Sequence, residues 1–255
     1  MYGLILAAGR GSRMGAATDD RPKALVELNG IPLISWQISA FRSAGIKTIG
    51  VVTGYRADLL EPYGDRHFHN ENWATTNMVA SLRCASEWLA VDNCIISYSD
   101  IVYDPSAIEL LTHSTSDLAI TYDPDWLKLW ALRFEDPLTD AETFRVDETS
   151  MLLEIGGSPK SIEEVQGQYM GLLKIGPAGW QILLETLCSS SPELQQTMHL
   201  TTLLDQLTSN TPGRITCLAY RGRWAEVDST TDLTVAERLF SPPSDGLAIR
   251  PLPAN

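Results

Sequence analysis

Short apolar stretches that alternate with helical patterns constrain the fold of this chain more than any other feature of its sequence. The first stretch, YGLILAA at residues 2–8, precedes a glycine-rich turn; a helix is expected over 32–44 and the next strand over 47–54. Such alternation is typical of parallel strands joined by crossover helices. We therefore expect an α/β fold, with a Rossmann-like, mainly parallel sheet and helices on both faces.

The rest of the chain continues this alternation. Further strands are expected over 66–70, 93–100, 117–123, a region with Trp126 and Trp130, 151–157, 169–175 and 214–222. Further helices are expected over 56–63, 77–90, 178–187, 199–208 and 230–239. We expect a single domain over residues 1–240. The Pro-rich segment 241–255 is expected to be an extended or disordered tail, or a linker.

Charge and composition exclude several classes of function. The net charge is −13, with 32 acidic residues against 19 Lys and Arg, whereas nucleic acids favour basic surfaces. No apolar run approaches the roughly 20 residues that cross a membrane, and the first run is too short for a secretory signal. The four cysteines show no paired spacing, which favours free thiols. We expect a cytoplasmic protein that binds neither nucleic acid nor membranes.

A basic, glycine-rich loop follows the first strand. The first 25 residues contain Arg10, Arg13, Arg21 and Lys23, and a local basic loop in an acidic protein favours a small polyanion as ligand. In parallel α/β folds, ligands bind at the carboxyl ends of the strands, where this loop lies. The loop is neither a P-loop, because GxxxxGK[ST] is absent, nor a dinucleotide fingerprint, because Met14 stands at the third glycine of GxGxxG.

The string LAAGRGSRM at 6–14, with PKAL at 22–25, resembles the signature of nucleotidyltransferases that join an NTP to a phosphorylated small molecule. The resemblance implies a nucleotide-diphospho-sugar transferase-like fold with a small acceptor-binding insertion. Glycines let backbone N–H groups approach phosphates, and Arg13 can hold two phosphate oxygens. Lys23 can reach the α-phosphate or the acceptor. The loop residues expected at the nucleotide are Leu6, Ala7, Ala8, Gly9, Arg10, Gly11, Ser12 and Arg13.

Two aspartates match the metal-binding pair of these enzymes. Asp100 ends the strand 93–100, and Asp228 lies just before the helix 230–239, where an N-cap is its alternative role. Nucleotidyl transfer builds negative charge at the α-phosphorus and on pyrophosphate, which a divalent cation held by carboxylates neutralises. We therefore expect Mg²⁺ at Asp100 and Asp228. The expected catalytic residues are Lys23, Arg13, Asp100 and Asp228.

The segment NENWATTNMVASL at 70–82 resembles a block of the small cytidylyltransferases that act on phosphocholine and on phosphonates. The resemblance implies CTP as the nucleotide. Asn77 and Ser81 lie one helical turn apart and can face one pocket, although helix capping is an alternative role for these polar residues. The residues expected to bind the nucleotide here are Asn72, Thr76, Asn77 and Ser81, together with Asp100.

Residues 122–144 and 167–180 resemble the same cytidylyltransferases, particularly members of phosphonate pathways that can be fused to a phosphomutase. Aromatic and acidic side chains there are expected to hold an amine or quaternary ammonium. Core packing is the alternative role for Trp126 and Trp130. The residues expected to bind the acceptor are Lys23, Trp130, Arg133, Lys160, Tyr169 and Glu226.

The sequence thus predicts an Mg²⁺-dependent enzyme that transfers CMP from CTP to a small phosphonate or a phosphorylated amine or alcohol, with release of pyrophosphate. The acceptor can be of the 2-aminoethylphosphonate, 2-hydroxyethylphosphonate or phosphocholine type, and a phosphorylated amide or amino acid also remains open. The alternatives are a sugar-1-phosphate nucleotidyltransferase using another NTP and a regulatory nucleotide-binding domain without catalysis. A homodimer, and fusion to or cooperation with a phosphomutase, are expected from the resemblance.

Overall fold

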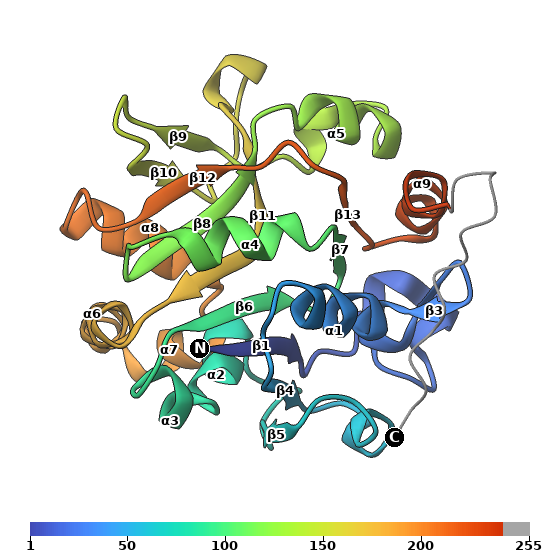
Figure 1. Ribbon diagram of the computed structural model, residues 1–255. Helices are drawn as coiled ribbons and strands as arrows, with labels where there is room; N and C mark the ends of the chain where they lie inside the picture. The colour runs from blue at the N-terminus through green and yellow to red at the C-terminus, as the bar shows by residue number, and fades with distance from the viewer. Residues whose placement is uncertain (242–255) are drawn as a thin grey trace.

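A seven-stranded sheet forms the centre of the protein (Figure 1), whose computed structural model describes residues 1–241. The strand order is β12-β8-β11-β6-β1-β4-β5. Strand β11 runs antiparallel to both of its neighbours, whereas the other pairs are parallel. The predicted α/β fold with a mainly parallel sheet is therefore confirmed. The strands of this sheet are β1 (Tyr2–Ala7), β4 (Ile49–Thr53), β5 (Arg66–His69), β6 (Cys94–Tyr98), β8 (Leu118–Asp123), β11 (Gln168–Ile175) and β12 (Thr216–Ala219).

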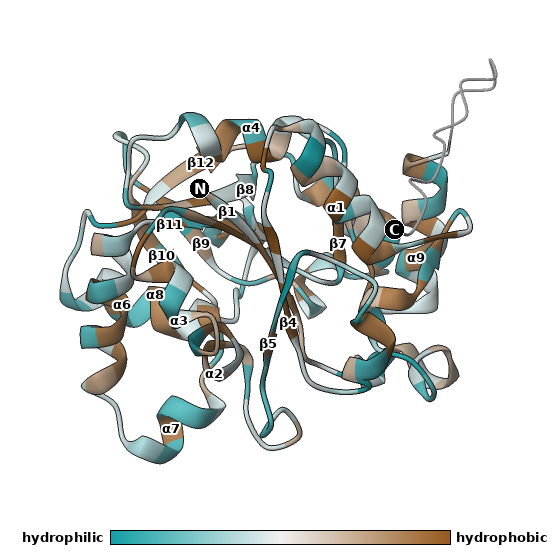
Figure 2. Ribbon diagram, turned by 60° about the horizontal axis from the view of Figure 1, so that its bottom comes forward, coloured by the Kyte–Doolittle hydropathy of each residue, from teal (hydrophilic) through white to brown (hydrophobic). Residues whose placement is uncertain are grey.

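Helices cover both faces of this sheet. Alternation along β1 sends Leu4 and Leu6 into one apolar core and Ile5 into the other. Helices α2, α3, α6 and α8 pack on the first face, and α1, α4 and α5 on the second, as Figure 2 shows for all but α5. The helices are α1 (Leu33–Ser43), α2 (Met78–Arg83), α3 (Ser86–Leu89), α4 (Ser106–His113), α5 (Leu127–Arg133), α6 (Pro177–Cys188), α7 (Pro192–Thr197), α8 (Leu200–Asn210) and α9 (Thr230–Leu239).

Two predicted helices differ from the structure. The helix expected over 77–90 is divided into α2 and α3, because Ala85 leaves helical geometry with φ −95° and ψ 18°. The helix expected over 56–63 is only a 3₁₀ turn at Ala57–Leu60. The region with Trp126 and Trp130, expected to be a strand, is instead helical and forms α5. The structure also contains α4 and α7, which the sequence analysis did not predict.

A short two-stranded ribbon lies beside the main sheet and positions the two predicted metal ligands. Strands β7 (Ile101–Tyr103) and β13 (Trp224–Glu226) pair antiparallel, with Glu226 opposite Ile101. The N–H of Val227 donates to the carbonyl of Asp100 at 2.8 Å. The ribbon and α9 share an apolar cluster that includes Val102, Val227 and Ala236. Residues 100 and 228 are therefore held side by side although they are far apart in sequence.

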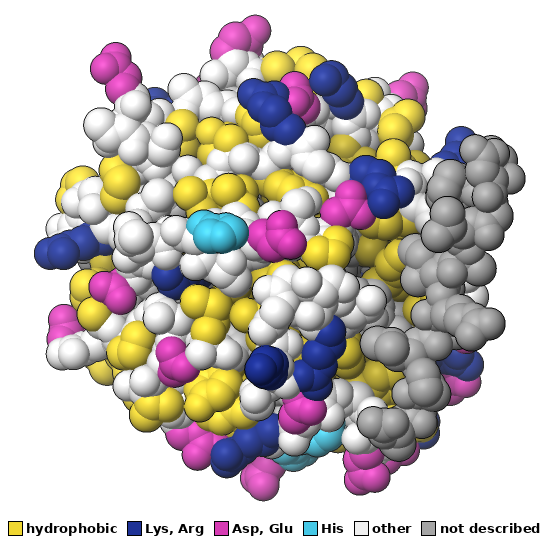
Figure 3. Space-filling view, viewed as in Figure 1, with side chains coloured by type: hydrophobic (Ala, Val, Ile, Leu, Met, Phe, Trp, Pro, Cys, Tyr) yellow, Lys and Arg dark blue, Asp and Glu magenta, His cyan; other side chains and the backbone are white. Residues whose placement is uncertain are grey.

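Two hairpins complete the fold. They are formed by β2 (Glu27–Leu28) with β3 (Ile31–Pro32), and by β9 (Phe144–Val146) with β10 (Leu152–Ile155). On the face shown in Figure 3, acidic and basic side chains are interspersed. All four cysteines are free thiols, and no helix within residues 1–241 combines the length and apolarity of a membrane span. Apart from Ser241, the predicted tail at 241–255 lies outside the described residues.

Candidate active site

A cavity of about 260 Å³ opens at the carboxyl ends of β1 and β6. Its walls come from three segments: the glycine-rich loop after β1, the end of β6, and the first turns of α2 with the residues that precede it. The structure therefore brings the predicted phosphate loop and most of the predicted base-binding block into one site. The lining residues are Leu6, Ala8, Gly9, Gly11, Ser12, Arg13, Lys23, Trp73, Thr76, Asn77, Met78, Ser81, Tyr98, Ser99 and Asp100.

Gly11 sets the path of the loop beside Lys23. Its φ is +76°, in the left-handed region that favours glycine. A Cβ added at Gly11 would lie 2.6 Å from Cβ of Lys23. The carbonyl of Gly11 accepts hydrogen bonds from the N–H of Met14 at 3.0 Å and from the hydroxyl of Thr18 at 2.9 Å. The loop thus requires glycine here both for its conformation and for its close approach to the lysine.

Lys23 is 5% exposed and lies between two carboxylates. Its Nζ donates to Oδ2 of Asp100 at 2.9 Å and also to Oδ1 of Asp228. Burial alone would lower the pKa of Lys23, but the negative charges of Asp100 and Asp228 outweigh it and raise that pKa. Arg13 forms an ion pair with the other oxygen of Asp228 at 2.8 Å, although its side chain remains 70% exposed. All four predicted catalytic residues therefore meet beside the cavity, and three of them, Arg13, Lys23 and Asp100, line it.

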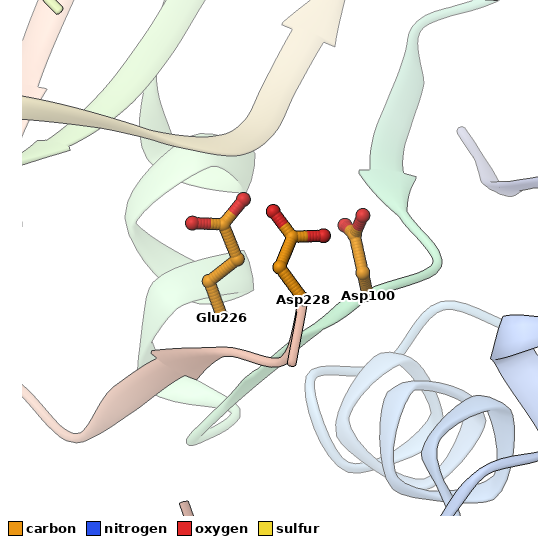
Figure 4. A group of neighbouring side chains, drawn as sticks. All are labelled: Asp100, Glu226 and Asp228. Carbon is orange, nitrogen blue, oxygen red and sulfur yellow. The ribbon is translucent and has the colours of Figure 1, made fainter. Parts of the chain in front are cut away.

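Three carboxylates, those of Asp100, Glu226 and Asp228, form a group suited to a divalent cation (Figure 4). One oxygen of each lies within 4.8 Å of the others. Oδ1 of Asp100 is buried and has no hydrogen-bond partner among residues 1–241. Oxygen donors of this kind are the ligands that Mg²⁺ prefers. The predicted pair thus fits the ion, and Glu226 joins it.

Glu226 was expected at the acceptor, not at the metal. It lies two residues before Asp228, and residues at this spacing share a face of an extended strand. Burial raises its pKa to about 8, assisted by repulsion from Asp228, while the charge of Arg133 acts in the opposite direction. The alternation of acidic and apolar residues in EVD, residues 226–228, is the sequence signal that could have placed Glu226 beside Asp228.

On the wall that α2 contributes to the cavity, short polar side chains surround the start of the helix. Three of the residues predicted to bind the nucleotide line the cavity: Thr76, Asn77 and Ser81. The fourth predicted residue of this block, Asn72, does not line it and is exposed. Asn70 is the buried asparagine here, with 5% exposure, and it was not predicted. Its side chain donates to the hydroxyls of both Thr76 and Ser81 at 3.0 Å. Trp73, Met78, Tyr98 and Ser99 also line the cavity without having been predicted.

Two loop residues that were predicted to bind the nucleotide, Ala7 and Arg10, do not line the cavity. Ala7 packs in the core on the face of the sheet opposite Leu4 and Leu6. Arg10 forms an exposed ion pair with Asp19 at 2.7 Å, and its guanidinium lies 5.8 Å from the ring centre of Tyr55. One of the acids that follow the loop thus neutralises a loop arginine.

Trp130 and Arg133 of α5 are buried rather than open to a ligand. The ring of Trp130 lies 6.0 Å from both Trp126 and Trp224, an arrangement that matches the alternative of core packing. The guanidinium of Arg133 lies 4.7 Å from the ring centre of Trp130. It pairs with Asp232 at 2.7 Å and with Glu226 at 3.0 Å. The carboxylates of Asp232 and Glu226 thus neutralise much of the charge of this arginine.

The other predicted acceptor residues are divided between two places. Tyr169 packs edge-to-face against Tyr98 of the cavity wall, with ring centres 5.8 Å apart. Lys160 is exposed and lines a second cavity of about 350 Å³. That cavity is formed by the β9–β10 hairpin and the following loop, with Arg145 and Glu154 among its lining residues. The structure therefore does not bring Lys160 to the site of Lys23 and Asp100.

Comparison with known proteins identifies the family. The model of the MobA-like NTP transferase domain matches residues 3–132. The chain is 33% identical to the CTP:phosphoglutamine cytidylyltransferase of Campylobacter jejuni over 92% of its own length and 98% of that protein. It is 32% identical to the 2-aminoethylphosphonate cytidylyltransferase of Lancefieldella rimae over 39% of its own length and 42% of that protein.

The fold matches a solved cytidylyltransferase. The CTP:phosphocholine cytidylyltransferase of Streptococcus pneumoniae superposes with a TM-score of 0.70 at 21% identity, covering 93% of this chain and 98% of that one. The resemblance inferred from the sequence is thus confirmed at the level of family and fold. The chain belongs to the MobA-like NTP transferase domain family and is a nucleotidyltransferase related to cytidylyltransferases that act on phosphorylated or phosphonate substrates.

Proposed function

We propose that the protein transfers CMP from CTP to a small phosphorylated acceptor in an Mg²⁺-dependent reaction that releases pyrophosphate. The observation that carries this proposal is the meeting of Lys23, Asp100 and Asp228 beside the glycine-rich loop. Binding of a nucleotide alone would not require a buried lysine together with three converging carboxylates. This arrangement favours catalysis over a purely regulatory role.

In an in-line transfer, each group of the site would have a separate role. Backbone N–H groups of the loop, with Arg13, are placed to hold the phosphates of CTP. Lys23 holds the acceptor anion and the α-phosphate together against their mutual repulsion. Mg²⁺ held by Asp100, Asp228 and Glu226 would neutralise charge on the departing pyrophosphate. Because the acceptor phosphate is already an anion at neutral pH, the reaction needs no dedicated general base.

The acceptor in this proposal is a phosphorylated amino acid or amide of the phosphoglutamine type. The similarity to the phosphoglutamine enzyme extends over 92% of the chain, whereas the similarity to the aminoethylphosphonate enzyme covers 39%. Asp140 lies close enough to Asp228 for the two charges to repel, Glu142 lies close to Asp140 in the same way, and burial raises the pKa of each of Asp140 and Glu142. The ammonium group of an amino acid would compensate these partly buried acids.

Pyrophosphate release tests this function directly. Four NTPs are crossed with phosphoglutamine, 2-aminoethylphosphonate, phosphocholine and a set of sugar-1-phosphates, each with Mg²⁺ and with EDTA. We expect turnover with CTP and phosphoglutamine that EDTA abolishes. Turnover with a sugar phosphate and another NTP would replace the proposed reaction, and nucleotide binding without turnover across the whole panel would favour the regulatory alternative.

A further inference from the structure

We infer that Asn70 determines the preference for cytosine by fixing the direction of the Ser81 hydroxyl, so that this hydroxyl donates to the ring nitrogen N3 of the base. The inference rests on the proposed use of CTP. It concerns a residue that follows β5, outside the phosphate loop and the carboxylate group.

The orientation of the Asn70 side-chain amide is fixed by its neighbours. The backbone N–H of Asn72 donates to Oδ1 of Asn70 at 3.0 Å, and a backbone N–H can face only the oxygen of the amide. The nitrogen, Nδ2, must therefore face the other way. There it donates one hydrogen to Thr76 Oγ1 and one to Ser81 Oγ, both at 3.0 Å. Asn70 thus uses its carbonyl and both N–H groups within the protein.

The two hydroxyl groups that accept these hydrogen bonds differ in whether their own hydrogen is already donated within the protein. Thr76 Oγ1 in turn donates its hydrogen to the carbonyl of Asn72 at 2.8 Å, so it has no hydrogen left for a ligand. Ser81 Oγ accepts from Asn70, and among the contacts of residues 1–241 its own hydrogen has no acceptor. Ser81 lines the cavity and is only 7% exposed. The serine therefore offers the cavity a donor.

This donor belongs to the wall that α2 contributes, separate from the wall formed by the glycine-rich loop, and the base of a nucleotide would lie against it if the phosphates meet that loop. Cytosine carries a hydrogen-bond acceptor at N3, whereas uracil carries a donor, N3–H, at the same position. The Ser81 donor is therefore complementary to cytosine. The N3–H of uracil could be accepted only by the remaining lone pair of Ser81 Oγ, which would turn the serine hydrogen away and leave it buried without an acceptor. A site built around such a buried hydrogen bond rejects a base that cannot complete it.

Substitution of Asn70 by aspartate reverses this polarity with almost no change in shape. A carboxylate at position 70 has no hydrogens to give, so the Ser81 hydroxyl turns and donates to it. The donor that faces N3 is then lost. Ser81→Ala removes the same donor by deleting the hydroxyl itself. It provides an independent test if the Asn70→Asp variant does not fold.

The experiment compares CTP with 3-deaza-CTP, in which N3 is replaced by C–H, and with UTP. For the wild type we expect kcat/KM for CTP to exceed that for 3-deaza-CTP by about tenfold or more, the value of one buried hydrogen bond. In Asn70→Asp and in Ser81→Ala this ratio falls toward one, mainly through KM, and the CTP/UTP ratio falls with it. In the Asn70→Asp/Ser81→Ala double variant, the CTP/3-deaza-CTP ratio falls no further than in either single variant, because Asn70 acts through Ser81.

Asn210→Asp is the matched control, since it makes the same change at an exposed residue at the end of α8 and should keep the wild-type ratio. The inference is overturned if the wild type does not distinguish CTP from 3-deaza-CTP. It is also overturned if folded Asn70→Asp, or Ser81→Ala, lowers kcat/KM for both nucleotides by the same factor, as a purely structural role would. If the wild type turns over only another NTP, the proposed function itself fails; a wild type that prefers CTP with unchanged ratios in the variants rejects this inference alone.

Discussion

Lys23 occupies the space between two carboxylates that are also suited to a divalent cation. Its ammonium is bound to Asp100 and Asp228, and both are members of the three-carboxylate group. Without a positive charge, these buried and half-buried acids would repel one another at close range. The lysine thus stabilises the acids when no cation is bound, and it must share or release them when one binds.

Replacing this lysine separates its two roles. In Lys23→Ala we expect turnover to fall by at least about 100-fold, because the acceptor and α-phosphate lose the group that holds them together. Mg²⁺, measured by calorimetry, should bind more tightly, since its competitor for the aspartates is gone. Lys47→Ala, at an exposed position, is the control. Near-wild-type turnover in Lys23→Ala would remove this residue from the mechanism.

Asp100 has a buried oxygen that lacks a hydrogen-bond partner within the described part of the chain, so a substitution there tests the metal site directly. Asp100→Asn keeps the shape of the side chain but removes its charge. The Mg²⁺ concentration needed for half-maximal turnover should rise by about tenfold or more, while the fold is retained. Asp58→Asn provides an exposed control. An unchanged magnesium titration would contradict a ligand role for Asp100.

Among the structural elements, the loop after β1 depends most on a single residue. Gly11 and Gly30 share nearly the same φ, +76° and +75°, but only Gly11 lies against Lys23; a Cβ at Gly30 would meet nothing within 4 Å. The two glycines therefore separate the cost of the backbone conformation from the cost of displacing the lysine.

Alanine at each position measures these two costs. Gly11→Ala should lose turnover by at least about 100-fold, because its Cβ forces Lys23 away from the aspartates. Gly30→Ala should lower the free energy of unfolding by only about 1–2 kcal/mol, the cost of a left-handed alanine, and keep its turnover. Denaturant unfolding and pyrophosphate release give the two readouts. Equal turnover in the two variants would show that contact with Lys23 is unimportant.

Elements with long apolar patterns could be predicted from the sequence, whereas short ones could not. Strands β1, β4 and β6 have four or more buried residues in a row, but β7 and β13 have three residues each, too few to show a period. The glycine loop and two aspartates were predicted because they belong to a recognisable motif. The ion pairs of Arg133 and the separate position of Lys160 depend on contacts between distant segments, which local sequence does not encode.

At the scale of the whole molecule, Arg133 connects α5 with β13 and α9. Its side chain is 1% exposed and pairs with Glu226 and Asp232. The second oxygen of Asp232 accepts from the backbone N–H of Asp228 at 3.0 Å and of Ser229 at 2.8 Å. The arginine therefore supports the backbone that carries a predicted metal ligand, through Asp232, which forms a capping box with the N-cap residue Ser229 of α9.

Removing this arginine should destabilise the whole protein. In Arg133→Ala, buried acids lose their counter-ion, and we expect the free energy of unfolding to fall by about 3–5 kcal/mol. In Arg223→Ala, which breaks the more exposed pair with Asp104, the loss should stay below about 1 kcal/mol. Urea denaturation compares the two variants. A small effect at Arg133 would mean that its pairs contribute little and would reopen a direct role at the acceptor.

The ribbon of β7 and β13 also has a consequence for the order of events during synthesis. The glycine loop and Lys23 emerge from the ribosome among the first residues, and Asp100 follows before the middle of the chain. Asp228 arrives only after β12, and its position depends on the pairing of β13 with β7. A growing chain therefore has its glycine-rich loop long before it can assemble all three carboxylates, and we expect prematurely terminated chains that lack β13 to be catalytically silent.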